Sequence, residues 1–225
     1  MRYTMLGKTE LKVSQATIGT WAIGGAGWGD VNKKESMEAI ETMIERGVNL
    51  IDTAPFYGLG ESEKIVGEVI RDKRDDIVLL TKAGTGWNEK GVPFKRSDYK
   101  SILKDCEESL QRLKTDYIDL YLIHWPDEVT PIEEMMDAMN KLKQDGKIRF
   151  IGASNFSKEE VLESEKYVSF DVLQHPYSMV AQDFRELLTW AHKNNIGTMS
   201  YGSLGAGILT GSIREMPKFS EDDMR

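Results

Sequence analysis

The sequence contains little of several residue types that define other classes of protein. A single cysteine, Cys106, among 225 residues excludes an internal disulfide framework and is typical of a reducing compartment. The three histidines, His124, His175 and His192, do not have the spacing of zinc ligands, so we expect no metal site. No apolar run is long enough to cross a bilayer, and the N-terminus lacks a signal-peptide core. We therefore expect a cytoplasmic protein without a membrane partner.

The chain also lacks an excess of positive charge. Its formal net charge is −8, from 37 acidic and 29 basic residues. No stripe of Lys and Arg alternates with aromatic residues, so we expect no nucleic-acid partner. Local amides and a few cations can still bind an anion on an acidic protein, so a dinucleotide ligand is not excluded. With 40% hydrophobic residues, the length and composition predict one domain over residues 1–225.

Continuous apolar runs recur along the chain, and stretches with helical periodicity separate them. A strand that is buried on both faces gives a continuous run rather than an alternating one. Strands that alternate with helices predict repeated β-α units around a parallel sheet, which is an α/β fold. The predicted strands occupy residues 16–19, 48–52, 77–81, 118–123, 148–152, 172–174 and 196–200.

Helix signals lie between the predicted strands. Ser97 and Ser157 are predicted N-caps, and Glu160 completes a capping box with Ser157. Besides the helix that begins behind Ser157, helices are expected over residues 34–46, 62–71, 97–113, 131–146 and 182–194.

Three segments depart from the β-α repeat. Residues 2–13 predict a hairpin whose alternating apolar residues are Tyr3, Met5, Leu11 and Val13. Residues 83–96 are expected to form a long polar loop over the mouth of the fold. Residues 202–225 contain no run suited to an eighth strand.

Polar residues stand where the predicted strands end. In a closed β/α barrel the carboxyl ends of the strands carry the active site. Neighbouring strands lie only about 4.8 Å apart, so side chains at their ends can converge on one point. The residues predicted around this single mouth are Asp52, Lys82, His124, Ser154 and Gln174. Tyr57 joins them from the loop that follows Asp52.

Four of these side chains form a set with a specific chemical use. A free phenol has a pKa of roughly 10, and a nearby ammonium lowers it. We expect Lys82 to lower the pKa of Tyr57 by about one to three units, with Asp52 keeping Lys82 charged. His124 would orient a carbonyl oxygen, and Tyr57 would protonate it as a general acid. The chain supplies no nucleophile for the carbon, so a cofactor hydride is the natural candidate.

Each of these residues has an ordinary structural alternative. An aspartate at a strand end often caps a turn, and a lysine after a strand is usually solvated. A tyrosine is commonly a packing residue, and His124 could be a buried histidine with satisfied hydrogen bonds. The conjunction of all four at three adjacent strand ends therefore carries more weight than any one of them.

Several segments together resemble the aldo-keto reductase superfamily, and most closely its bacterial NADPH-dependent type. They are GVNLIDTAPFYGLGESEKIVGE, LLTKAG, SLQRLKTDYIDLYLIHWPD, GKIRFIGASNF and MSYGSLGAGILTG. The resemblance implies a (β/α)8 TIM-type barrel with an N-terminal β-hairpin at its bottom. It also implies metal-free reduction of aldehydes and ketones, with a catalytic tetrad of Asp52, Tyr57, Lys82 and His124.

The resemblance further implies binding of NADP(H), or of NAD(H) in its place. Residues implied to contact the nicotinamide are Gly19, Thr20, Trp21, Asp52, Ser154, Asn155, Gln174 and Tyr201, the last by stacking. Residues implied to meet the pyrophosphate are Gly202, Ser203, Leu204 and Gly207. The substrate pocket for a small carbonyl compound would be lined by Trp21, Tyr57, Trp87, His124 and Trp125.

The chain resembles a family member that is truncated at its C-terminus and lacks the eighth β/α unit. Loss of this unit would leave the first and last strands with open edges, so a monomer and an edge-mediated homo-oligomer are both expected alternatives. Two other functions stay open. The chain could be a regulatory subunit built on a reductase barrel, or a truncated remnant without activity. The physiological substrate is not specified.

Overall fold

The protein is built around one curled parallel sheet of seven strands. The computed structural model describes residues 1–25, 31–88 and 92–215. The strand order across the sheet is β11-β10-β9-β8-β5-β4-β3, and every pairing is parallel. The strands are β3 (Ile18–Gly19), β4 (Leu50–Asp52), β5 (Val78–Ala83), β8 (Ile118–Ile123), β9 (Ile148–Ser154), β10 (Val172–Pro176) and β11 (Gly197–Tyr201).

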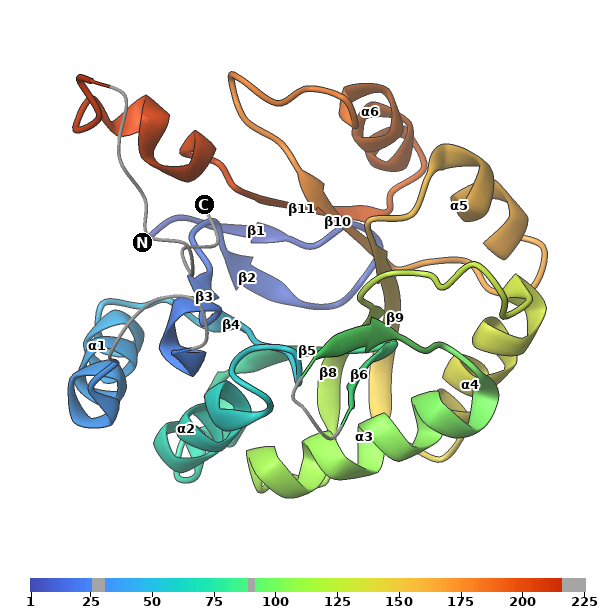
Figure 1. Ribbon diagram of the computed structural model, residues 1–225, viewed down its shortest axis with the longest axis horizontal. Coiled ribbons are helices and arrows are strands. Elements are labelled where there is room, and N and C mark those ends of the chain that lie inside the picture. The colour runs from blue at the N-terminus through green and yellow to red at the C-terminus, as the bar shows by residue number, and fades with distance from the viewer. Residues whose placement is uncertain (26–30, 89–91, 216–225) are drawn as a thin grey trace.

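Within the described residues, six α-helices cover the outer face of the sheet (Figure 1). They are α1 (Lys33–Glu45), α2 (Glu61–Ile70), α3 (Tyr99–Leu113), α4 (Ile132–Gln144), α5 (Lys158–Ser164) and α6 (Arg185–Lys193). Among the described residues, the outer edges of β3 and β11 pair with no further strand. The predicted TIM-type architecture without its eighth unit is therefore confirmed. No helix in the described part of the chain has the length and apolarity that a bilayer span requires.

An N-terminal hairpin lies at the amino ends of the barrel strands, where the Lys8 amide donates to the Asn195 carbonyl and the Tyr3 hydroxyl to the Gly47 carbonyl. It consists of β1 (Tyr3–Met5) and β2 (Lys12–Ser14), which pair antiparallel. Its buried Leu6, Leu11 and Val13 pack with interior strand residues, including Leu80 and Leu122. The predicted alternation is wrong for Tyr3 and Met5, which are exposed. Leu6, directly after β1, is 5% exposed and contributes to the interior cluster in their place.

Two predicted helix starts have different outcomes. The capping box is confirmed, because the Ser157 hydroxyl accepts from the Glu160 amide and the Glu160 carboxylate accepts from the Ser157 amide. The predicted cap at Ser97 is wrong, since α3 is capped by the carboxylate of Asp98, which accepts from the Ser101 amide. Ser97 is instead buried, and its hydroxyl donates to the Trp125 carbonyl at 3.3 Å.

The segment predicted as a long polar loop contains a second hairpin. Strands β6 (Thr85–Trp87) and β7 (Pro93–Lys95) pair antiparallel, beyond the end of β5. The Arg96 guanidinium contacts the Asp105 carboxylate of α3 at 2.6 Å and ties this hairpin to the barrel. Alternation over three residues is too short to distinguish such strands from a loop in the sequence.

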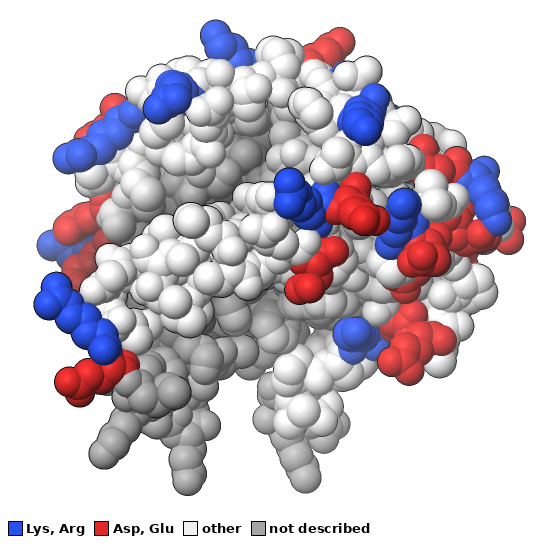
Figure 2. Space-filling model, turned by 90° about the horizontal axis from the view of Figure 1, so that it is seen from above, with Lys and Arg blue, Asp and Glu red and all other residues white. Residues whose placement is uncertain are grey.

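Beyond β11 the chain forms a short 3-10 segment, η3 (Gly205–Thr210), and no eighth strand follows within the described residues up to 215. Its Ile208 is 61% exposed and the preceding Leu204 is 60% exposed. Figure 2 views the side of the molecule that carries η3 and α6, and shows an extended area without charged residues beside a dense group of them. Residues 216–225 of the predicted tail lie outside the described part of the chain.

Candidate active site

Period-two alternation of the strands brings the predicted polar residues to one end of the barrel interior. Each of these residues follows an interior residue of its strand by two positions, as Asp52 follows Leu50, Lys82 follows Leu80 and Gln174 follows Val172. Because the strands are parallel, these positions share one rim. The strand-end residues predicted from the sequence thus lie at the carboxyl end of the sheet, as expected of a barrel site.

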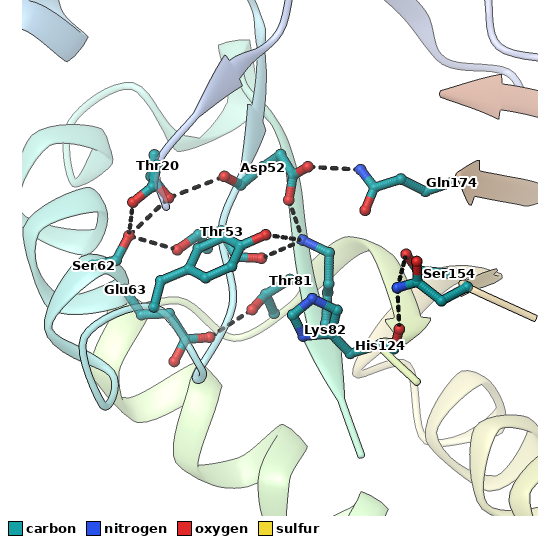
Figure 3. A network of polar contacts seen from close by, with 12 residues as sticks. Thr20, Asp52, Thr53, Ser62, Glu63, Thr81, Lys82, His124, Ser154 and Gln174 are labelled. Carbon is teal, nitrogen blue, oxygen red and sulfur yellow. Dashed lines mark hydrogen bonds and ion pairs between the residues drawn. The ribbon is translucent and has the colours of Figure 1, made fainter. Parts of the chain in front are cut away.

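The Lys82 ammonium is the centre of this cluster. It forms an ion pair with the Asp52 carboxylate, and donates to the Thr53 carbonyl oxygen and to the Tyr57 phenol oxygen, each at 3.1 Å. An ammonium has three N–H donors, so all three are used. Figure 3 shows Lys82 pointing to Asp52 and Thr53. With a side chain that is 1% exposed, Lys82 is held in one orientation, toward the phenol.

Burial has opposite consequences for the two members of the Lys82–Tyr57 contact. Burial lowers the pKa of Lys82, but the Asp52 carboxylate and the Tyr57 phenol outweigh it, so that this pKa is raised. Burial also raises the pKa of Tyr57, and the nearby Lys82 only partly offsets it. The predicted net lowering of the Tyr57 pKa is therefore wrong in this structure. Tyr57 is a protonated phenol near neutral pH.

His124 stands at the carboxyl end of β8 as a neutral imidazole. Burial, with a smaller effect of the Lys82 charge, holds its pKa well below the usual value. Its ring stacks on that of Trp125 at 3.7 Å and meets the Tyr57 ring edge-on at 5.9 Å. Its Nδ1 is buried and has no hydrogen-bond partner among the described residues. A neutral imidazole keeps one N–H donor, which suits it to hold an uncharged oxygen.

The residues expected at the nicotinamide form a second group beside the first. The Gln174 Nε2 donates to Asp52 at 2.6 Å, and the Tyr201 hydroxyl donates to the Asn155 Oδ1 at 2.7 Å. Asn155 Nδ2 donates to the His124 carbonyl at 2.9 Å and to Ser154 at 3.1 Å. Asn155 has a φ of 62°, a left-handed conformation that asparagine tolerates, which turns its amide back over β8.

The β3 end and the segment after β11 contribute very differently. Thr20 donates to the Asp52 carbonyl from both its amide and its hydroxyl, at 3.0 Å in each case, so Gly19 and Thr20 border the cluster. The four residues expected at the pyrophosphate are exposed or half-exposed, and Gly202 has open space around its α-carbon. Those residues are Gly202, Ser203, Leu204 and Gly207.

This arrangement fits a nicotinamide dinucleotide. Ser154, Asn155 and Gln174 place hydroxyl and amide groups side by side, and such groups match the donors and acceptors of a carboxamide. The Tyr201 ring, which is 40% exposed, provides an aromatic face next to them. The exposed glycines after β11 allow an anion to approach the backbone closely. The described residues contain no cluster of metal-ligating side chains.

Two of the three predicted pocket tryptophans are brought to the cluster. The Trp21 ring lies 6.3 Å from the Tyr57 ring, and Trp125 stacks on His124. Trp87 lies on β6 and makes no ring contact with Tyr57 or His124. The sequence reasoning missed Phe56, which meets the His124 ring at 6.0 Å and the Trp125 ring at 5.7 Å, both edge-on. Phe56 directly precedes Tyr57 in the sequence, and this position could have indicated that it lies at the site.

The loops that carry Trp21 and Tyr57 touch through bare backbone. A Cβ atom built on Gly24 would lie 2.5 Å from the Gly58 nitrogen, and one built on Gly58 would lie 2.0 Å from the Gly24 oxygen. Gly58 also has a φ of 61°. Both positions therefore require glycine.

The fold and the cluster define a β/α-barrel protein with a polar, partly aromatic site at the carboxyl ends of its strands. Comparison with known proteins identifies its class. Residues 16–225 match the model of the Aldo/keto reductase family. The chain therefore belongs to the aldo/keto reductase family, which is a family of oxidoreductases.

Individual relatives support this assignment. The chain is 43% identical to Aldo-keto reductase YhdN of Bacillus subtilis, covering 100% of this chain and 69% of that protein. It is 40% identical to the NADH-specific methylglyoxal reductase of Escherichia coli, covering 95% and 70%. The structure of a glycerol dehydrogenase from Gluconobacter oxydans superposes with a TM-score of 0.91 at 38% identity, covering 99% of this chain and 70% of that one.

Proposed function

We propose that the protein reduces the carbonyl group of an aldehyde or ketone, using a nicotinamide dinucleotide as hydride donor and Tyr57 as general acid. The observation that carries the proposal is the Lys82 ammonium, whose donors are divided among Asp52, the Thr53 carbonyl and the Tyr57 oxygen. A buried ammonium fixed against a phenol stabilises the phenolate that forms when the phenol releases its proton.

The side chains divide the chemistry among them. The neutral His124 donates a hydrogen bond to the substrate oxygen and orients it toward Tyr57. When bound, the reduced nicotinamide supplies a hydride to the carbonyl carbon. Tyr57 transfers its proton to the oxygen as negative charge develops there. Its raised pKa keeps that proton in place at neutral pH, and Lys82 lowers the free energy of the phenolate that remains.

The cofactor contacts belong to the same proposal. Ser154, Asn155 and Gln174 would hold the carboxamide, Tyr201 would stack on the ring, and the backbone of Gly202–Gly207 would meet the pyrophosphate. Both NADP(H) and NAD(H) are candidates, because one relative with 40% identity is named for NADH specificity. Trp21, Phe56 and Trp125 give the mouth an apolar rim, which favours carbonyl compounds with apolar bodies.

The test is reduction of 4-nitrobenzaldehyde by the purified chain, with NADPH and NADH compared and followed by loss of the reduced nicotinamide absorbance. Tyr57→Phe should lower kcat by about 10²–10⁴-fold, because the general acid is removed. Tyr3→Phe, a change to an exposed tyrosine on β1, is the matched control and should retain activity. Nucleotide binding without turnover would replace this proposal with a regulatory subunit, and absence of binding would indicate a remnant.

A further inference from the structure

A chain of three buried hydroxyl groups lies beneath the cluster and has no part in the chemistry proposed above. The Ser62 hydroxyl lies 3.0 Å from that of Thr53, 2.7 Å from that of Thr20 and 3.0 Å from the Thr20 carbonyl. All three residues are 0% exposed. Figure 3 shows the Ser62 hydroxyl between Thr20 and Thr53. The group joins β3, β4 and α2, the elements that border the Tyr57 loop.

Counting donors fixes the direction of this chain. The Thr20 hydroxyl proton goes to the Asp52 carbonyl, so at Ser62 the Thr20 oxygen can only accept. The Ser62 proton is therefore used toward Thr20, and the Thr53 hydroxyl must donate to Ser62. Ser62 therefore accepts from Thr53 at the end of β4 and donates to Thr20 at the end of β3. Its removal leaves the Thr53 hydroxyl buried without a partner.

Thr53 connects this chain to the ammonium. Its side chain is held by Ser62 and its amide donates to the Leu80 carbonyl at 3.0 Å, while its own carbonyl accepts from Lys82 at 3.1 Å. Of the three acceptors that direct Lys82, the Asp52 and Tyr57 groups are on side chains and the Thr53 carbonyl belongs to the backbone. A rotation of the Thr53 peptide would therefore turn the ammonium away from Tyr57.

We propose that Ser62 is a positioning residue for the reaction: its hydroxyl fixes Thr53 so that the Thr53 carbonyl aims the Lys82 ammonium at the Tyr57 phenol. This inference rests on the proposed reductase function for its kinetic consequence, whereas its structural claim concerns the Lys82 hydrogen bonds alone. Ser62 touches neither the substrate nor the reacting atoms, and it acts through Thr53.

The kinetic test uses Ser62→Ala and the isosteric Thr53→Val, which keeps the backbone carbonyl. Each should lower kcat about tenfold with KM nearly unchanged, because misplacement of a catalytic group weakens only the transition state. The double variant should lose no more than about twofold beyond either single variant, since both break the same link. Ser164→Ala removes an equally buried hydroxyl on α5 and should retain full kcat.

A spectroscopic test does not need turnover. The ¹⁵N-labelled ammonium of Lys82 should give an observable signal because buried acceptors slow its proton exchange, and Lys82→Met identifies it by its loss. Exchange should become faster by about tenfold or more in Ser62→Ala and Thr53→Val, and stay unchanged in Ser164→Ala.

The outcomes separate the two claims. Unchanged kcat and unchanged ammonium exchange in folded Ser62→Ala and Thr53→Val would overturn the positioning role. Additive losses in the double variant would also overturn it, since they would show that Ser62 does not act through Thr53. An inactive wild-type chain whose Lys82 exchange still responds to Ser62→Ala would remove the proposed reaction but keep the hydrogen-bond link.

Discussion

The two sides of the barrel mouth differ in how far their side chains are exposed. On the β4–β5–β8 side, which we call the organised side, Lys82 uses all its donors on protein groups, and the neighbouring hydroxyls form one directed chain. On the β10–β11 side, which we call the open side, Tyr201 is 40% exposed, Met179 is 82% exposed and Ile208 is 61% exposed. The chemistry of the site is preorganised in the fold, whereas the side assigned to the nucleotide presents apolar surface that a ligand could cover.

The largest expected effect comes from removing the centre of the organised side. Lys82→Met should lower kcat by about 10³-fold, because the phenolate that forms when Tyr57 releases its proton loses its counter-charge. Nucleotide affinity, measured by quenching of tryptophan fluorescence, should change little if the two sides act separately. A kcat within tenfold of wild type would show that the ammonium is not needed.

The packing behind the organised side gives the second prediction. Glu63 on α2 is 0% exposed, accepts from the Thr81 hydroxyl at 2.6 Å and pairs with Arg112 of α3 at 2.6 Å. Arg112→Met should lower the free energy of unfolding by about 3–5 kcal/mol, because a buried carboxylate loses its partner. Urea denaturation of the variant and the wild type measures this difference in the free energy of unfolding.

An exposed pair supplies the control for that prediction. The side chains of Lys104 and Glu108, which form an ion pair on α3, are 63% and 40% exposed. Lys104→Met breaks this pair and should lower the free energy of unfolding by no more than about 0.5 kcal/mol. Equal losses in the two variants would contradict the assigned difference between buried and surface pairs.

The open side should respond in affinity rather than in rate. Tyr201→Leu should raise the Kd of the nucleotide about tenfold through loss of ring stacking, with kcat nearly constant at saturating nucleotide. Tyr201→Phe keeps the ring and loses only the hydrogen bond to Asn155, so its Kd should stay within about twofold. A fall in kcat without a change in Kd would place Tyr201 on the organised side.

The last prediction concerns His124 and is a modest pH dependence of stability. Its pKa is held well below the usual value in the folded protein, so below about pH 6.5 the unfolded chain binds more protons than the native one. Stability should therefore fall on acidification, by about 1 kcal/mol one unit below that pH. Urea unfolding of wild type and His124→Gln should show a difference that shrinks as the pH falls.

The organised side was largely predictable from the sequence because strand geometry determines it. A period of two and a parallel register bring Asp52, Lys82 and His124 to one rim, whatever the helices do. The links of Thr53 and Ser62 were not predictable, since they depend on where the first turn of α2 lies against two strand ends. The predicted direction of the Tyr57 pKa shift was also wrong, because the shift depends on how deeply the phenol is buried, and burial is set by the packed fold.

The outer features show the same limit. The N-cap at Asp98 and the β6–β7 hairpin differ from the predictions because neighbouring candidates in sequence, such as Ser97, compete and tertiary contacts decide between them. The capping box at Ser157 was predictable because both of its partners lie within one helical turn.

The close contact between the backbones of Gly24 and Gly58 limits how this protein can be redesigned. The segment bearing Trp21 and the segment bearing Tyr57 cannot be grafted one at a time from a relative of different spacing, since a side chain at either glycine would wedge them apart. Swapping both segments as a unit preserves their fit, so a change in ligand selectivity is better sought by transplanting the pair together.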